Sequence, residues 1–177
     1  GICKADDFKR HAKANRLEGY LFPTTYYFDA NMPAEKVAAR LRAEFDKRIP
    51  PQFDKTSPKP NLSLHQAMTL ASIIEREAVL PQEKPMIAAV YLNRMRIRMR
   101  LEADPTVQYA LGVWKKGLTI TDLRHPSAYN TYVHYGLPPG PICSFGLDSL
   151  RAALRPARTD AIFFVADNTG GQVFSST

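Results

Sequence analysis

The segment from Ser63 to Leu80 constrains the fold most, because it predicts one amphipathic helix with a defined start and stop. Ser63, followed three residues later by Gln66, fits a capping box, and Pro81 supplies the stop. On a wheel of about 100° per residue, one continuous arc is apolar. Its members are Leu64, Ala67, Met68, Leu70, Ala71, Ile74 and Ala78. The chain must bury this arc, so we expect the core to form around it.

One carboxylate, Glu75, falls inside the apolar arc, whereas Glu77 falls on the opposite, polar side and is expected to face water. A carboxyl group on the core side loses solvation, which raises its pKa unless a cation or several donors compensate. A general acid that keeps its proton near neutral pH needs such a site. Glu75 is therefore a candidate general acid. The alternative, a structural carboxylate satisfied by an arginine or a helix end, is the commoner case on the wheel alone.

Composition sets wide limits. The 177 residues are 45% hydrophobic, enough for one domain with a core. The net charge of +7 suits an anionic partner such as nucleic acid, a membrane surface or an acidic polymer, but such a balance is common without one. The basic run 94–100 has no accompanying nucleic-acid module. Cys3, Cys143 and four scattered histidines lack metal-ligand spacing, so we expect no metal. We find neither a signal peptide nor a segment able to span a bilayer.

The remaining elements are expected as follows. Helices are predicted at 6–14, 34–48, 85–95 and 149–154, the last capped by Asp148 or Ser149. A strand is predicted at 17–28 and a hairpin at 161–166 and 172–176, and 50–60 is expected to be a surface connection. The run 94–100 fits a helix end or a short strand.

Two further regions carry polar or aromatic groups that could serve a site. Asp104 before Pro105 fits a helix N-cap. Because this structural role explains the residue fully, it is the favoured interpretation over a second catalytic carboxylate. The proline-rich stretch 127–146 carries Tyr129, Asn130 and Tyr132, which could form a binding-site wall, although a stiff connector explains it equally well. The aromatic residues of 17–28 could stack on sugars or bases, but packing is the favoured explanation.

The motifs LEGYLFPTTYYF, ASIIEREA, VYLNRMRIRMRLEADPTVQYALG, AYNTYVHYGLPPGPICSFG, SLRAALRPA and FFVADNTGGQVFS occur in this order from Leu17 onward. In wording and order they closely resemble the MltG (YceG-like) family of endolytic murein transglycosylases. The resemblance implies a peptidoglycan lytic transglycosylase that cleaves the β-1,4 bond between N-acetylmuramic acid and N-acetylglucosamine without water, leaving a 1,6-anhydro end, with no cofactor.

The resemblance assigns the catalytic glutamate to Glu75. It implies a softer set of substrate-side residues: Asn93, Arg94, Asp104, Gln108, Tyr129, Asn130, Tyr132 and Gly136. We expect an α+β fold, with a helical lysozyme-like core and a small sheet formed by strands from both ends of the chain. We expect residues 1–16 to be an N-terminal remnant or linker and 17–177 a catalytic domain lacking its C-terminal end.

The family context implies a bacterial inner-membrane protein whose catalytic domain faces the periplasm, with an anchor absent from this chain. Its implied partners are peptidoglycan strands and, by analogy, peptidoglycan synthases, with no nucleic acid. Three rival functions remain. A hydrolytic muramidase would use Asp104 or Glu102 as second carboxylate, a non-catalytic peptidoglycan-binding scaffold would not cleave, and a pyridoxal-phosphate lyase would need a Schiff-base lysine, for which no lysine has a suitable setting.

Overall fold

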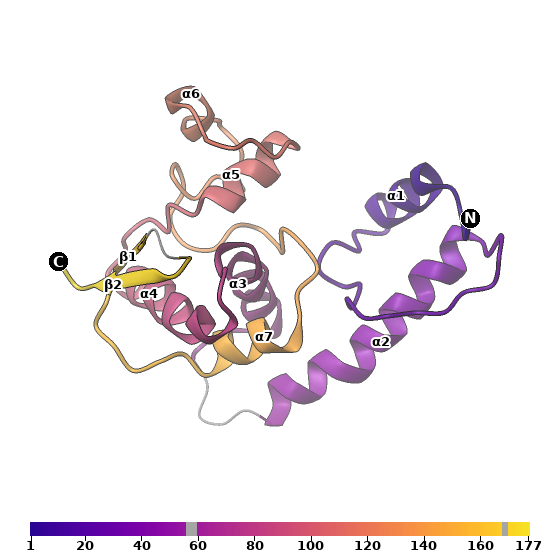
Figure 1. Cartoon of the computed structure of the whole chain (residues 1–177), viewed down its shortest axis with the longest axis horizontal. Coiled ribbons are helices and arrows are strands. Elements are labelled where there is room, and N and C mark those ends of the chain that lie inside the picture. Colours follow the sequence, from indigo (N-terminus) through magenta and orange to yellow (C-terminus); the bar gives the residue numbers. More distant parts are fainter. Residues whose placement is uncertain (56–59, 168–169) are drawn as a thin grey trace.

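The computed structural model describes residues 1–55, 60–167 and 170–177. Its helices are α1 (Ala5–Ala14), α2 (Ala34–Lys55), α3 (Leu64–Glu77), the 3₁₀ turn η1 (Pro81–Glu83), α4 (Lys84–Arg96), α5 (Asp104–Leu111), α6 (Ile120–Leu123) and α7 (Leu147–Leu154), and its strands are β1 (Phe163–Ala166) and β2 (Gln172–Ser175). Figure 1 shows α3, α4 and α7 gathered into one body, from which α2 leads away to α1 at the N-terminal end. The architecture is therefore a helical core with an N-terminal arm and a C-terminal hairpin.

Helix α3 forms the centre of the core, as its sequence predicts. The capping box is present: the Ser63 hydroxyl accepts from the Gln66 backbone N–H at 3.2 Å, and the Gln66 side chain accepts from the Ser63 N–H at 2.8 Å. Leu70, Ile73 and Ile74 are fully buried. The helix packs chiefly against α7 and also against α4. Because it is enclosed on several sides, side chains on α3 are held in fixed positions.

The second helix is longer than its sequence predicts. It continues through Pro50 and Pro51 to Lys55, so the expectation that 50–55 belongs to a surface connection was wrong. Phe45 and Ile49 are buried just before the prolines, and their packing holds the helix where a proline has no N–H to donate. Residues 56–59 of that predicted connection lie outside the described residues.

Among the residues that the structure describes, the sheet consists of the predicted C-terminal hairpin. Strands β1 and β2 are antiparallel, with Phe163 opposite Ser175, and the tip at 168–169 lies outside the described residues. The strand predicted at 17–28 was wrong: this stretch is irregular, Tyr27 is exposed, and the Tyr20 ring packs on Phe45 of α2 with the ring centres 5.2 Å apart. The α+β class with a helical core is confirmed, but the sheet draws on one end of the chain.

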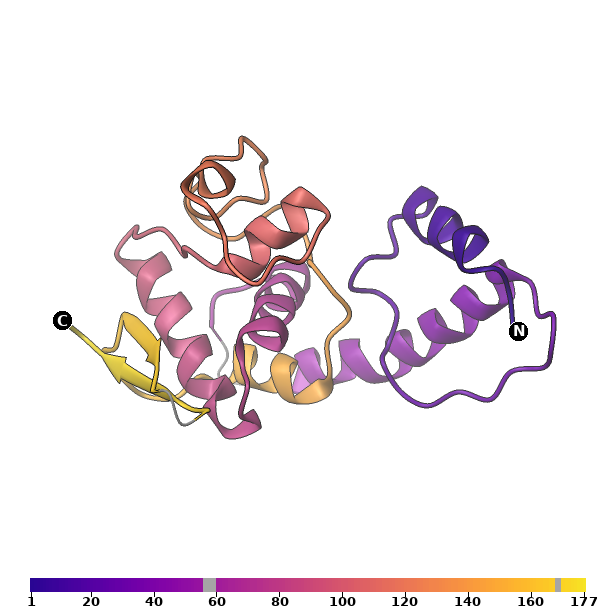
Figure 2. The same ribbon diagram turned by 45° about the horizontal axis from the view of Figure 1, so that its top comes forward.

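Local capping also differs from expectation. Asp104 is the first residue of α5 and makes no capping hydrogen bond, since Ala103 holds the cap position. Gly146, rather than Asp148 or Ser149, precedes α7. The run 94–100 ends α4 and forms no strand. Figure 2 shows α5 and α6 lying over the core beside α3 and α4. None of the helices in the described ranges is long and apolar enough to cross a membrane.

Candidate active site

Glu75 projects from the last turn of α3 toward the start of α7. Its Oε2 accepts hydrogen bonds from the Lys84 ammonium at 3.1 Å, from the Gly146 backbone N–H at 3.4 Å and from the Ser149 hydroxyl. The Glu75 side chain is 31% exposed and that of Lys84 is 14% exposed. The helix places Glu75 beside the core, as predicted, but the neighbouring groups are polar donors.

These donors decide the protonation of Glu75. Burial raises its pKa, but the hydrogen bonds from Ser149 and Lys84, with the charge of Lys84, outweigh burial and leave the pKa below its usual value of 4.5. A cation and several donors therefore compensate for burial, which is the exception stated for a core-side carboxyl, and the sequence pattern did not reveal these partners. Near neutral pH Glu75 is a carboxylate.

Glu77 shows the opposite behaviour. The expectation that it faces water was wrong: it is partly buried, and its Oε1 accepts a hydrogen bond from the Tyr91 phenol at 2.8 Å. Burial raises the pKa of Glu77 to about 7, with the Asp104 carboxylate adding to the rise, while the Tyr91 hydrogen bond and the Arg94 charge oppose it. Near neutral pH a large fraction of Glu77 carries a proton.

Three of the predicted substrate-side residues, Asp104, Tyr132 and Arg94, interact with Glu77 or with its neighbours. The Tyr132 phenol donates to Asp104 Oδ1 at 2.5 Å, and burial, the Asp104 hydrogen bond and the charges of Asp104 and Glu77 all raise the pKa of Tyr132. Asp104 and Arg94 both shift the pKa of Glu77. Asp104, Tyr132 and Arg94 thus converge on Glu77, whereas the groups that contact Glu75 come from the first residue of α4 and from the start of α7.

Arg94 and its neighbour Asn93 also hold the backbone of the C-terminal segment. Arg94 donates through Nε to the Ile162 carbonyl at 2.6 Å and through Nη1 to the Leu101 carbonyl at 2.7 Å. Asn93 donates to the carbonyls of Thr159 and Ala161. Both side chains therefore fix the path of the chain near the site.

The side chains of two other predicted residues form hydrogen bonds with the backbone. Gln108 forms a pair of hydrogen bonds with the backbone of Lys115, at 2.9 and 2.8 Å. Asn130 is fully buried, donates to the carbonyls of Leu123 and His125, and accepts from the Tyr132 N–H. Asn130 thereby orients the turn that carries Tyr132 toward Asp104.

The last two predicted residues lie on the 127–146 stretch. Tyr129 is partly buried, with its ring centred 4.8 Å from that of Tyr109. Gly136 has a φ of +79° and no neighbouring heavy atom within 4 Å of the position a Cβ would take. Glycine adopts this left-handed conformation without steric cost. It allows the chain to turn after Tyr135.

Sequence reasoning did not find Tyr91, Lys84 or Ser149 as partners of the two glutamates. Tyr91 lies within the helix predicted at 85–95, and Lys84 stands one residue before it. The polar contacts of all three span 9 to 74 positions in the chain. Among the described residues, no three His, Cys, Asp or Glu side chains come together as a metal ion would require.

Comparisons with known proteins agree along nearly the whole chain. A family model described as the YceG-like family matches residues 2–177. The "Endolytic murein transglycosylase" of Bacillus subtilis (strain 168) is 39% identical over 173 residues, which cover 97% of this chain and 48% of the relative. The protein of the same name from Streptococcus pneumoniae (strain D39) is 33% identical over 164 residues, covering 90% of this chain and 30% of the relative.

A solved structure also matches. The crystal structure of a putative YceG-like protein from Listeria monocytogenes superposes with a TM-score of 0.83 at 36% identity, covering 99% of this chain and 62% of that chain. The chain therefore spans half or less of the length of the two named relatives and somewhat less than two thirds of the solved one.

Proposed function

This chain belongs to the YceG-like family, and we propose that it is a lytic transglycosylase that cuts peptidoglycan glycan strands within their length. The names of its relatives from Bacillus and Streptococcus support the reaction and the murein substrate. The bond cleaved is the β-1,4 bond between N-acetylmuramic acid and N-acetylglucosamine, and the product carries a 1,6-anhydro-N-acetylmuramic acid end.

This reaction needs one carboxyl group that starts protonated. The acid gives its proton to the glycosidic oxygen, and the bond from that oxygen to C1 breaks. The resulting carboxylate then takes the proton of the 6-hydroxyl as that oxygen bonds to C1, so the carboxyl group is restored and no water is consumed. A second catalytic carboxylate is not required, in contrast to the usual glycoside hydrolase pair.

The observation that carries the choice of acid is the pKa of Glu77, raised to about 7 by burial. A group with this pKa is protonated often enough to act as an acid and is basic enough to take the proton back. Glu75 remains the choice that the sequence motif favours. In the present geometry, however, Glu75 is ionised by Lys84 and Ser149, and it would have to lose those contacts to serve as an acid.

We assign the substrate-side roles by electrostatic interaction with Glu77 and by hydrogen bonding to the groups that interact with it. Tyr132 and Asp104 form a hydrogen-bonded pair beside it, and Arg94 adds a positive charge. These groups are placed to bind sugar hydroxyl or acetamido groups and to stabilise positive charge that develops at C1. Tyr129 would line the approach, while Asn93, Gln108, Asn130 and Gly136 would act by holding the backbone.

A hydrolytic muramidase is the second candidate, because Asp104 is close enough to Glu77 to raise its pKa. In that reaction Asp104 would activate a water or form a glycosyl intermediate, and the product would have a reducing end. The two functions therefore differ in a product that can be weighed.

The deciding experiment is mass spectrometry of products from purified, uncross-linked glycan strands, treated with wild type, Glu77→Gln or Glu75→Gln. We expect anhydromuramyl ends from the wild type, none from Glu77→Gln, and reduced but measurable cleavage by Glu75→Gln. Circular dichroism checks that each variant is folded. Loss confined to Glu75→Gln would return the acid to Glu75, reducing ends would indicate a hydrolase, and no cleavage by folded wild type would leave a binding scaffold.

We further propose that the protein acts on the periplasmic side of the bacterial inner membrane, in company with peptidoglycan synthases. The proposal is supported by the name of its Bacillus relative, which gives murein, a cell-wall polymer outside the cytoplasm, as what that protein acts on. Fractionation of cells, followed by cross-linking and identification of co-purified synthases, tests this. Recovery from the cytoplasm would contradict it.

A further inference from the structure

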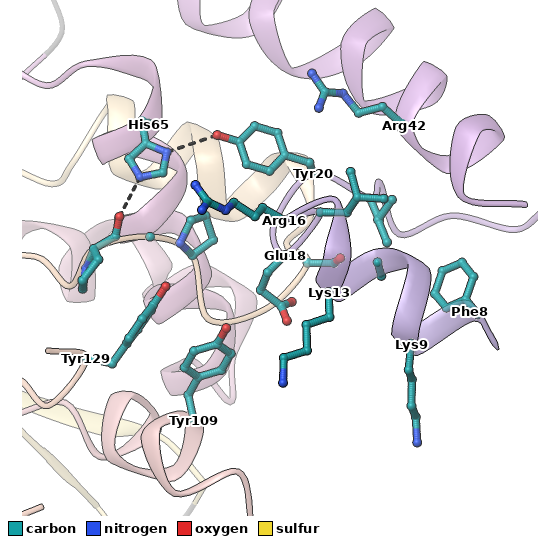
Figure 3. Close-up of a pocket in the computed structure, with 17 residues that line it drawn as sticks. Phe8, Lys9, Lys13, Arg16, Glu18, Tyr20, Arg42, His65, Tyr109 and Tyr129 are labelled. Atoms are coloured by element: carbon teal, nitrogen blue, oxygen red, sulfur yellow. Dashed lines mark hydrogen bonds between the residues drawn. The ribbon is translucent and has the colours of Figure 1, made fainter. Parts of the chain in front are cut away.

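A large pocket lies between the N-terminal arm and the core, away from the two glutamates. Its volume is about 1150 Å³. One wall is formed by α1 and the segment 16–21, and the other by α3, α5 and the 129–144 stretch, as Figure 3 shows. The proposed cleavage chemistry makes no use of this space.

The arm side of the pocket is positively charged. Lys9, Lys13 and Arg16 line it, all three are exposed, and none has an ion-pair partner among residues 1–55, 60–167 and 170–177. A fourth cation, Arg42, pairs with Asp46 at 2.9 Å and lies over the Tyr20 ring. Glu18 is the carboxylate among the lining residues. Charge on this wall is therefore poorly compensated.

The core side is aromatic and firmly built. The Tyr20 phenol lies 3.1 Å from His65 Nδ1, and His65 Nε2 lies 2.9 Å from the Pro139 carbonyl oxygen. That carbonyl can only accept, so His65 donates to it through Nε2–H. Tyr129 and Tyr109 continue the wall. This surface offers rings and hydroxyls to a ligand without changing shape.

The pocket shares two structural elements with the Glu77 site. Helix α5 places Tyr109 in the pocket and Asp104 beside Glu77, five positions apart, which is about 7.5 Å along a helix. The turn after Ser127 likewise carries Tyr129 to the pocket and Tyr132 to Asp104. A substrate bound at Glu77 could therefore extend into the pocket.

We propose that this pocket binds the short acidic peptide that peptidoglycan carries on its sugars. The proposal rests on the proposed function. Lys9 and Lys13 stand four positions apart on one face of α1, and Figure 3 shows both side chains extending from the same side of the helix. Lys9 and Lys13 are about 6 Å apart along the helix axis, close to two residues of an extended peptide. The concave shape suits a peptide better than a nucleic-acid strand.

The test uses two substrates and one free ligand. The substrates are glycan strands with their peptides and strands stripped of peptides by an amidase, and the ligand is the released tetrapeptide, measured by calorimetry. The variant is Lys9→Gln with Lys13→Gln. Its matched control is Lys36→Gln with Lys47→Gln, two exposed cations of α2 outside the pocket.

We expect the pocket variant to bind the tetrapeptide about fivefold more weakly, and the control variant to bind it as the wild type does. We also expect the ratio of KM for peptide-bearing to stripped strands to rise about fivefold. The wild-type affinity should fall with salt, because these charges are exposed.

Equal binding by the pocket variant, or an equal rise in KM for both substrates, would overturn the proposal. Stronger competition by a single-stranded oligonucleotide than by a peptide of the same charge would identify a nucleic-acid site instead. If the wild type binds the tetrapeptide through Lys9 and Lys13 but cleaves neither strand, the proposed function fails and the peptide site stands.

Discussion

The Tyr91 phenol donates a 2.8 Å hydrogen bond to Glu77, and this contact joins α4 to the last residue of α3. Tyr91 is almost fully buried, and its own pKa is raised well above 10 by burial and by the Glu77 charge. The phenol therefore stays protonated and can only donate to an ionised Glu77. It limits how far burial raises the pKa of that carboxyl.

Replacing Tyr91 with Phe should shift the pH dependence of cleavage. The hydrogen bond favours the ionised form of Glu77, so its loss raises the Glu77 pKa, by about one unit for a bond to a charged acceptor. The alkaline limb of kcat/KM reports the essential acid of the free enzyme. We expect this limb near pH 7 in the wild type and at higher pH in Tyr91→Phe.

Tyr26→Phe is the matched control for that shift. Its phenol donates to the Phe22 carbonyl at 2.8 Å, outside the Glu77 cluster, so its limb should coincide with that of the wild type. An unmoved limb in folded Tyr91→Phe would show that Glu77 is not the acid reported by kcat/KM.

Glu77 should also make stability depend on pH. Its folded-state pKa of about 7 lies above the ordinary value of 4.5, so the folded protein binds this proton more tightly than the unfolded chain does. Stability relative to Glu77→Gln is greatest below about pH 4.5 and falls as the pH rises to about 7, by about 3 kcal/mol in total. Urea denaturation of both proteins between pH 4 and 8 measures the difference. A constant difference over that range would contradict the raised pKa.

Glu75 differs from Glu77 in that its pKa is lowered, and Lys84 is one cause of the lowering. Lys84→Met removes the ammonium that helps keep the pKa of Glu75 low, so the burial of Glu75 should then raise this pKa. The pair lies between an exposed and a buried ion pair, so we expect about 1 kcal/mol of lost stability at pH 7. Carboxyl NMR of ¹³C-labelled glutamate measures the titration.

Lys115→Met serves as the comparison for that variant, because Lys115 pairs with Asp122 at 2.7 Å and contacts neither glutamate. Glu75 should titrate in it as in the wild type. An unchanged Glu75 titration in Lys84→Met would mean that Ser149 and Gly146 alone hold the carboxylate.

Helix α3 ends at Glu77, three residues before the expected Leu80. The sequence predicts its start and its apolar face because these signals are local to the segment: a capping box and an apolar arc. It does not predict which glutamate is buried, because the wheel assigns one face to the core and the other to water. Here Tyr91, Arg94 and Asp104 cover the second face with polar groups brought from elsewhere in the chain. Hydrophobicity cannot reveal a face that is buried by polar partners.

The strand predicted at 17–28 was wrong for a related reason: contacts with a distant part of the chain decide its structure. Its aromatic residues favour a strand locally, but Phe22 is buried and the Tyr20 ring packs on Phe45 of α2. This packing against a helix removes the two rings from water, so no partner strand is needed to cover them. The pocket beside them was not predictable either, since its walls come from five separated parts of the chain.

One close approach holds this irregular segment to the core, and it gives a final prediction. Gly19 has a φ of +79°, and a Cβ added there would lie 2.4 Å from the Pro141 Cβ. Gly19→Ala therefore combines left-handed backbone strain with a clash against a rigid ring, and should cost about 2 to 4 kcal/mol. Gly112→Ala has a similar φ of +68° but meets no atom within 4 Å, so it should cost about 1 kcal/mol. Urea denaturation compares the two, and equal losses would mean that the 17–22 segment can move away from Pro141 and that the pocket wall is adjustable.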